Sequence, residues 1–191
     1  MTNSLTPEEQ QILLETARKA IRQACQDEQV LPLNLEKYPL SLQEKGACFI
    51  TLRKKGALRG CVGTIEAVQP LILDVRDRAV AAALQDYRFS PLTLPELNEV
   101  QIEISRLTPP TRLEYQTADD LVNKLQSGVD GVVLKYHSRR ATFLPQVWEQ
   151  LPTPEIFLNR LCLKMGLDES AWKQGELQVE IYQVEKFQEQ D

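Results

Sequence analysis

The chain has 191 residues, 42% of them hydrophobic and 26% charged, which is typical of a globular protein with one sizeable core or two joined halves. Its net charge of -5 and pI near 5.1 argue against binding duplex DNA, which usually needs a basic face. No apolar run is long enough to span a bilayer, so we expect no membrane partner. The polar, acidic N-terminus lacks the features of a signal peptide, so we expect a cytoplasmic protein.

The cysteines indicate reduced thiols. Cys25, Cys48, Cys61 and Cys162 are scattered without a CxxC pair, which in a cytoplasmic chain argues against a disulfide framework. His137 is the only histidine, and no two cysteines have the spacing of zinc ligands. We therefore expect neither a metal site nor a cofactor.

The N-terminal half begins with a predicted helix. Thr6 is a good N-cap, Pro7 fits the first helical position and Glu9 closes a capping box, so a helix should run to about Gln26. Residues 27–45 contain two prolines and are expected to be extended. A strand follows over residues 47–53, then a hairpin turn in which Gly56 supplies a positive φ.

The second strand of this hairpin, residues 57–64, carries an unusual amount of special chemistry. Its sequence LRGCVG places one guanidinium and one thiol among two glycines. Because side chains alternate along a strand, we expect Arg59 and Cys61 on one side and Leu58 and Val62 on the other. Glycines in a strand permit the close approach of a ligand or of another backbone.

The remaining elements alternate between helices and strands. Pro70 should start a helix in which Asp74 and Arg78 pair, and a charged aromatic loop follows over residues 86–91. Further predictions are a strand at 100–104, a helix at 118–126, a hairpin at 131–144, a helix from Thr153 that ends at Gly166, and a final strand at 177–187.

The order hairpin, helix, strand occurs twice. Residues 99–104 read EVQIEI and residues 176–181 read ELQVEI, although alternation alone produces such matches readily. We expect an α+β fold, with a mainly antiparallel sheet flanked by helices, as one domain over residues 1–191. If the repeat is real, its halves cover about 46–108 and 128–187.

Cys61 is the candidate nucleophile, because a neighbouring arginine or helix N-terminus stabilises a thiolate. Its alternative role is that of a small buried hydrophobic residue. Arg59, Gly60, Gly63, Asp86 and Arg88 are the candidate ligand-binding residues. For the two glycines the alternative is a bend in the strand, and for Asp86 with Arg88 it is a structural ion pair.

Two further arrangements follow from the few remaining reactive side chains. His137, near the second hairpin turn, would have to be the base of any Cys61–His137 dyad, although a turn histidine is more often simply solvated. With Arg59, the basic residues of the two hairpin turns would form a local anion site, and their alternative role is that of solvated turns. They are Arg53, Lys54, Lys55, Arg139 and Arg140.

Several ordered motifs resemble the AMMECR1 family. They are LRGCVG at 58–63, AAALQDYRFSPL at 81–92, EISRLTP at 103–109, FLPQVWEQ at 143–150 and FLNRLCLKMGL at 157–167. Arg106 departs from the family pattern, which has an apolar residue there, and we expect it on the solvent face of its strand. The resemblance implies an α+β fold with a larger and a smaller subdomain, no settled activity, and a Memo-like protein and a radical SAM enzyme as partners.

Two hypotheses follow. The first is an enzyme or accessory subunit that handles a small organic or nucleotide-like ligand at the LRGCVG strand end, with Cys61 as nucleophile or tether and Arg59 orienting an anionic group. The second is a non-catalytic interaction module that docks a partner at this edge. Thiol reactivity distinguishes them, because only an accessible, activated Cys61 should react with iodoacetamide well below the ordinary thiol pKa of about 8.5.

Overall fold

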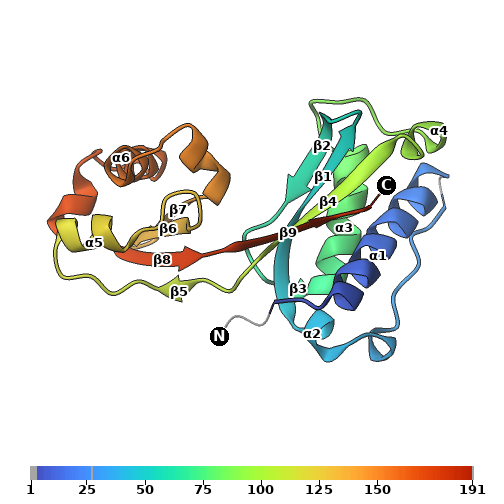
Figure 1. Ribbon diagram of the computed structural model, residues 1–191, viewed down its shortest axis with the longest axis horizontal. Helices are drawn as coiled ribbons and strands as arrows, with labels where there is room; N and C mark the ends of the chain where they lie inside the picture. Colours follow the sequence, from blue (N-terminus) through green and yellow to red (C-terminus); the bar gives the residue numbers. More distant parts are fainter. Residues whose placement is uncertain (1–3, 27, 191) are drawn as a thin grey trace. The chain divides into compact units, whose positions relative to one another are not determined.

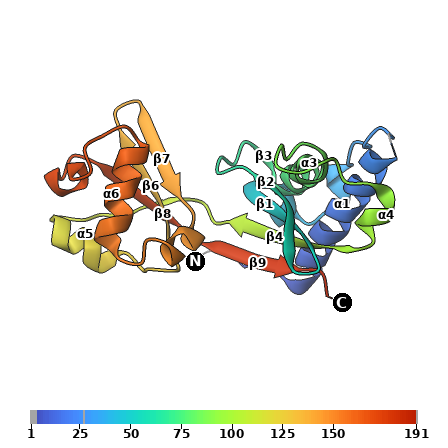
Figure 2. The ribbon, with the colours of Figure 1, turned by 90° about the horizontal axis from the view of Figure 1, so that it is seen from above.

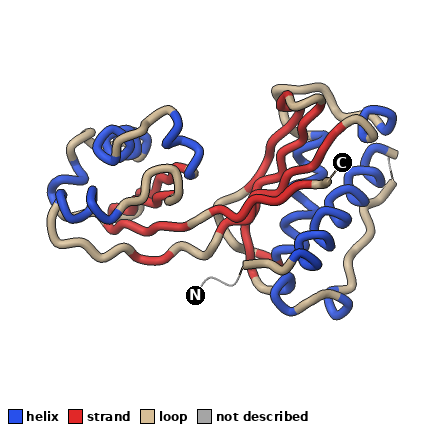
Figure 3. Tube along the Cα trace, viewed as in Figure 1, coloured by secondary structure: helices blue, strands red, loops and turns tan. Residues whose placement is uncertain are grey.

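The computed structural model describes residues 4–26 and 28–190 and divides the chain into two compact units. Unit 1, the larger, comprises residues 1–108 and 185–191, and unit 2 comprises residues 109–184 (Figure 1). Each unit has an antiparallel sheet flanked by helices, so the predicted α+β class is confirmed (Figure 3).

Unit 1 is built on a sheet with the strand order β2-β1-β4-β9, and β3 pairs with one end of β1. Its strands are β1 (Lys45–Lys54), β2 (Ala57–Gly63), β3 (Gln69–Pro70), β4 (Val100–Leu107) and β9 (Val184–Gln188). Its helices are α1 (Pro7–Cys25), α2 (Leu40–Gln43), α3 (Leu71–Leu84) and α4 (Leu94–Leu97), with a 3-10 helix at Leu35–Lys37.

The core of unit 1 lies between this sheet and the two long helices. Helices α1 and α3 pack against the same face (Figure 2), where Cys48, Ile50 and Leu52 of β1 are fully buried. Helix α1 begins as predicted, with the Thr6 side chain accepting from the Glu9 N–H and the Glu9 carboxylate accepting from the Thr6 N–H. Below, this side of the sheet is called the helix face and the opposite side the second face.

Unit 2 has the strand order β5-β8-β6-β7. Its elements are β5 (Thr111–Arg112), α5 (Ala118–Lys124), β6 (Gly131–Tyr136), β7 (Arg139–Phe143), α6 (Pro154–Lys164) and β8 (Gln178–Tyr182), with 3-10 helices at Pro145–Glu149 and Ala171–Gln174. The indole of Trp148 stacks on the Phe157 ring at 3.8 Å between centroids and anchors the core of the unit. Gly131 lies so close to Tyr182 that a Cβ there would stand 2.3 Å from the phenol ring.

The predicted path of hairpin, helix and returning strand occurs in both units. In unit 1 the hairpin β1–β2 leads through α3 to β4, which pairs with β1. In unit 2 the hairpin β6–β7 leads through α6 to β8, which pairs with β6. The strand orders β2-β1-β4 and β7-β6-β8 therefore correspond.

The C-terminal segment differs from the prediction. The single strand expected at 177–187 is divided into β8, which joins the sheet of unit 2, and β9, which joins that of unit 1. The expectation for Arg106 was also wrong. It pairs with Cys48 on the helix face and forms an ion pair with Glu185 at 3.2 Å, because β9 brings a carboxylate to it.

In the described part of the chain, the helices are too short or too polar to cross a membrane.

Candidate functional site

A β-bulge in the β1–β2 hairpin determines the geometry around Cys61. The turn is a two-residue loop in which Lys55 and Gly56 have φ values of 52° and 80°, and the strands start in regular register, with Lys54 opposite Ala57. The register then shifts by one residue, so that Arg53 lies opposite Leu58 but Leu52 lies opposite Gly60. Arg59 is therefore the extra residue of the bulge.

This shift moves the Cys61 side chain out of the core. Along a regular antiparallel hairpin, each step forward on one strand is matched by one step back on the other. Continued from Lys54 opposite Ala57, this register would place Cys61 opposite Ile50 on the helix face. With the bulge it lies opposite Thr51, on the second face, and it is half-buried. A one-residue slip transfers every later side chain of the strand to the other face.

The expectation that Leu58 lies on the side opposite to Cys61 was wrong. Leu58, opposite Arg53, lies on the same face as Cys61, opposite Thr51, because Arg53 and Thr51 are two residues apart on β1. Only Val62 lies opposite to Cys61 as predicted, since it pairs with Ile50 and packs against the core. The bulge breaks the alternation on which the prediction rested.

Arg59 is held by partners other than Cys61. Its Nε donates to Oε1 of Glu96 at 2.8 Å, and its Nη2 donates to Oε2 of Glu96 and to the Ser90 carbonyl, both at 2.9 Å. This two-point pairing raises the pKa of Arg59 and lowers that of Glu96. With 12% of its side chain exposed, Arg59 fastens α4 and the preceding loop to β2.

Asp86 and Arg88 cover the outer edge of β2 at Cys61. Because β2 is an edge strand, some of its main-chain groups point away from β1. The Cys61 N–H donates to Oδ2 of Asp86 at 2.8 Å, and its carbonyl accepts from Nη2 of Arg88 at 3.3 Å. The pair thus supplies the contacts that a further strand would make.

The two side chains of this pair are tightly joined. Nε and Nη2 of Arg88 donate to the two Asp86 oxygens at 2.9 and 2.6 Å, and the Arg88 N–H donates to Oδ1 at 3.2 Å. These bonds hold the pKa of Asp86 well below its usual range, and the N–H of Cys61 lowers it further. The carboxylate is buried, whereas 42% of the Arg88 side chain is exposed.

One residue that the sequence did not single out lies beside the sulfur, and a second follows it in the same row. The Thr51 hydroxyl donates to Sγ of Cys61 at 3.4 Å, and Glu103 lies next in the row, opposite Thr51 on β4. Glu103 forms longer ion pairs with Arg53 at 3.9 Å and Lys186 at 3.8 Å. A regular register continued from the turn would place Thr51 opposite Gly60. The sequence therefore does not identify Thr51 as a neighbour of Cys61 unless the bulge is known.

The two glycines are required by packing. A Cβ at Gly60 would stand 2.2 Å from the Ala82 carbonyl oxygen of α3, so this glycine allows the helix to approach the strand. A Cβ at Gly63 would stand 2.3 Å from the Phe49 ring and 2.5 Å from the Cys48 carbonyl oxygen. The sequence left open whether these glycines admit a ligand, admit another part of the chain, or bend the strand. In the structure, other residues of the chain fill the space beside both glycines.

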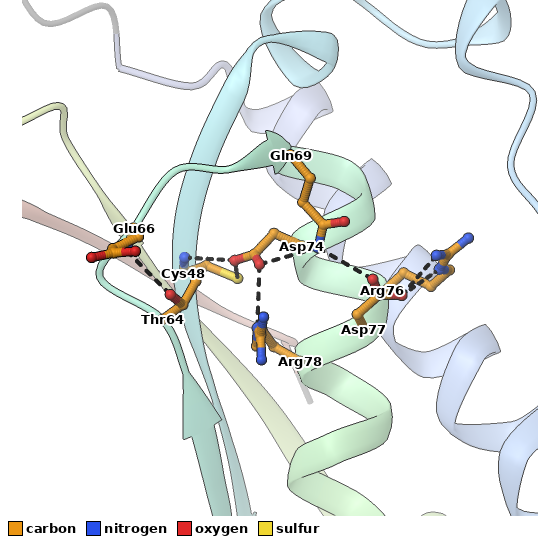
Figure 4. A network of polar contacts seen from close by, with 8 residues as sticks. All are labelled: Cys48, Thr64, Glu66, Gln69, Asp74, Arg76, Asp77 and Arg78. Carbon is orange, nitrogen blue, oxygen red and sulfur yellow. Dashed lines mark hydrogen bonds and ion pairs between the residues drawn. The ribbon is translucent and has the colours of Figure 1, made fainter.

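The other three cysteines differ from Cys61 in their surroundings. Burial raises the pKa of the Cys25, Cys48 and Cys162 thiols, most strongly at Cys48, where the Asp74 carboxylate adds to the effect. Figure 4 shows Asp74 between Cys48 and Arg78. Its carboxylate accepts from the Cys48 N–H at 3.0 Å and from Nε of Arg78 at 3.2 Å, the predicted pair on α3.

His137 belongs to unit 2, so the Cys61–His137 dyad stays a prediction. It occupies the β6–β7 turn with φ 51° and its ring contacts Tyr136 edge-on. It lines a hollow of about 670 Å³ with Arg139 and Arg140. Within residues 4–26 and 28–190, no group of three or more His, Cys, Asp or Glu is placed to hold a metal ion.

Comparisons with known proteins agree with one another. The AMMECR1 family model matches residues 14–187. The chain is 36% identical to a protein of Thermofilum pendens, over 97% of this chain and 92% of that one, and 35% identical to a protein of Methanopyrus kandleri, over 100% and 93%. The crystal structure of an uncharacterised protein from Pyrococcus horikoshii superimposes with a TM-score of 0.79 at 29% identity, covering 97% and 94% of the two chains.

Proposed function

The chain belongs to the AMMECR1 family, and from the geometry at Cys61 we propose that it is an enzyme or accessory subunit that handles a small organic or nucleotide-like ligand on the second face of the unit 1 sheet. Cys61 is the nucleophile or covalent tether in this proposal. The compartment that suits it is the cytoplasm, where all four cysteines stay as thiols.

The observation that carries the proposal is the bulge at Arg59. It places a glycine under α3 and turns the next side chain, a thiol, away from the core. If Cys61 were needed only for packing, a hairpin without the bulge would suffice, because it would place this side chain beside the buried Ile50. The structure instead directs the thiol to a face where Thr51 donates a hydrogen bond to it.

The proposed chemistry is that of an activated thiol. A hydroxyl that donates to sulfur favours the thiolate, which is the nucleophilic form. The sulfur would give its electron pair to an electrophilic carbon of the ligand, and the displaced pair would go to the leaving atom or to a carbonyl oxygen. The thiol proton would pass to solvent. Asp86 and Arg88 would keep the main chain of Cys61 fixed during this step.

Iodoacetamide labelling followed by peptide mass spectrometry tests the proposal. We expect Cys61 to be carboxamidomethylated below pH 8.5, while Cys48, buried beside Asp74, remains unlabelled in the folded protein and serves as the internal control. The Cys61→Ser protein should lose this label and keep its unfolding profile. If Cys61 labels no faster than Cys48, the thiol is structural and the proposal fails.

The alternative is a non-catalytic interaction module, favoured by two exposed hydrophobic residues, one beside Arg88 and one on the face of Cys61. Tyr87 is 96% exposed beside Arg88, and Leu58 is 41% exposed on the face of Cys61. The partners that the family resemblance suggests are a Memo-like protein and a radical SAM enzyme. Titration with a purified Memo-like protein tests this function: binding that Tyr87→Ala and Leu58→Ser weaken and Cys61→Ser leaves unchanged would favour docking over thiol chemistry.

A further inference from the structure

Five charged side chains lie next to Cys61 or on the second face of the sheet, and the cation of the pair next to Cys61 is the more exposed partner. Asp86 is buried under Arg88, whose side chain remains 42% exposed, so the pair presents its cation to solvent. On the second face itself, Arg53 and Lys186 lie on either side of Glu103. These five groups, three of them basic and two acidic, thus sum to one positive charge.

Arg88 has donors left for a ligand. Its hydrogen bonds within the described residues use the main-chain N–H, Nε and Nη2. Nη1 donates to none of the described residues and 42% of the side chain is exposed, while Asp86 holds the Nε–Nη2 edge and prevents the group from turning. The pKa of Arg88 is raised above its ordinary value by its hydrogen bonds to Asp86, and to a smaller extent by the charges of Asp86 and Cys61.

Arg88 also contacts the main chain of Cys61. Its Nη2 bonds the carbonyl of Cys61, the same residue that carries the thiol. The guanidinium also lies 5.6 Å from the centre of the Phe89 ring, which faces Arg59 at 5.8 Å. An anionic group bound at Nη1 would thus be held close to Cys61 by a cation that is already fixed.

We infer that the ligand of the Cys61 site carries an anionic group, a carboxylate or phosphate, and that Nη1 of Arg88 binds it. The inference rests on the proposed function and names the chemical class of its ligand. It also transfers to Arg88 the role that the sequence had suggested for Arg59, which is occupied by Glu96.

Two small reagents separate charge from reactivity. Iodoacetate and iodoacetamide alkylate sulfur at the same carbon: the S–C bond forms, the C–I bond breaks, iodide leaves with the electron pair and the thiol proton passes to solvent. They differ in that only iodoacetate is an anion. The measurement is the ratio of their rate constants at Cys61, read by mass spectrometry, against the same ratio for free cysteine in the same buffer.

We expect the iodoacetate to iodoacetamide ratio at Cys61 to exceed that of free cysteine by about threefold to tenfold at low salt and to fall as salt screens the cation. Arg88→Gln should return it to the free-cysteine value, and Arg88→Lys should keep part of it. Arg76→Gln is the matched control, because Arg76 also pairs with a neighbouring aspartate, Asp77, but on α3. It should leave the ratio unchanged.

Each contrary result has a distinct meaning. A Cys61 that reacts with neither reagent would refute the proposed function itself. A reactive Cys61 whose ratio equals that of free cysteine would refute the anionic ligand and leave the thiol proposal standing. A preference that Arg53→Gln or Lys186→Gln abolishes, but Arg88→Gln does not, would overturn the assignment to Arg88.

Discussion

Replacing Asp86 with asparagine tests whether this residue completes the edge of the sheet. The substitution keeps the shape and one acceptor oxygen for the Cys61 N–H, but removes the charge that pairs with Arg88. Removing one partner of a buried pair costs about 3–5 kcal/mol, and an exposed pair contributes about 0–1 kcal/mol. Because the carboxylate is buried and 42% of Arg88 reaches water, we expect Asp86→Asn to lower the free energy of unfolding by about 2 kcal/mol at pH 7. Asp86→Ala, which also leaves the N–H without an acceptor, should cost about 3 kcal/mol.

The loss should depend on pH in a defined direction. Arg88 holds the folded-state pKa of Asp86 below the unfolded value of about 3.9. The stabilisation is therefore complete above about pH 5 and is lost as the pH falls through the folded-state pKa. The difference between wild type and Asp86→Asn should stay constant from pH 7 to 5 and shrink below about pH 4.

Urea unfolding followed by circular dichroism, at constant ionic strength from pH 7 to 3, measures this difference. Carboxylates present in both proteins titrate alike and cancel in the comparison. Equal stability of Asp86→Asn and wild type at pH 7, or a difference that grows as the pH falls, would show that the pair does not support the strand edge.

Three further predictions concern the same sheet. Gly60→Ala should destabilise the protein by about 3 kcal/mol in urea, because the new Cβ meets the rigid Ala82 carbonyl, and a neutral result would contradict the close approach of α3. Thr51→Val should slow iodoacetamide labelling of Cys61 below pH 8 by about threefold to tenfold, whereas Thr51→Ser restores it, and equal rates for all three proteins would exclude the hydroxyl. Asp74→Ala should cost about 3–5 kcal/mol, since it leaves a buried N–H of β1 and an arginine of α3 without their acceptor. Urea midpoints unchanged from wild type would contradict that role.

The features of the fold that the sequence predicted correctly are local. The capping box at Thr6, the positive φ of Gly56 and the left-handed Gly166 that ends α6 each depend on a few adjacent residues, whose preferences hold in almost any context. The start of α3 after Pro70 and its i,i+4 pair follow for the same reason. Cys61 and Asp86 were also identified from sequence, but as separate residues in a strand and a loop.

What joins them is decided by tertiary structure. Whether β2 bulges at Arg59 depends on α3 lying against Gly60, a contact between segments about twenty residues apart that no alternation pattern contains. Likewise β8 and β9 form one apolar-polar pattern in the sequence, and only the available partner strands assign them to different sheets. The sequence by itself thus determined most of the elements and the reactive residue types, but not the two short helices within residues 27–45, which were expected to be extended. The register between strands, which places Cys61 beside Thr51 and its main chain under the Asp86–Arg88 pair, came from packing, because a strand takes its faces from its neighbours.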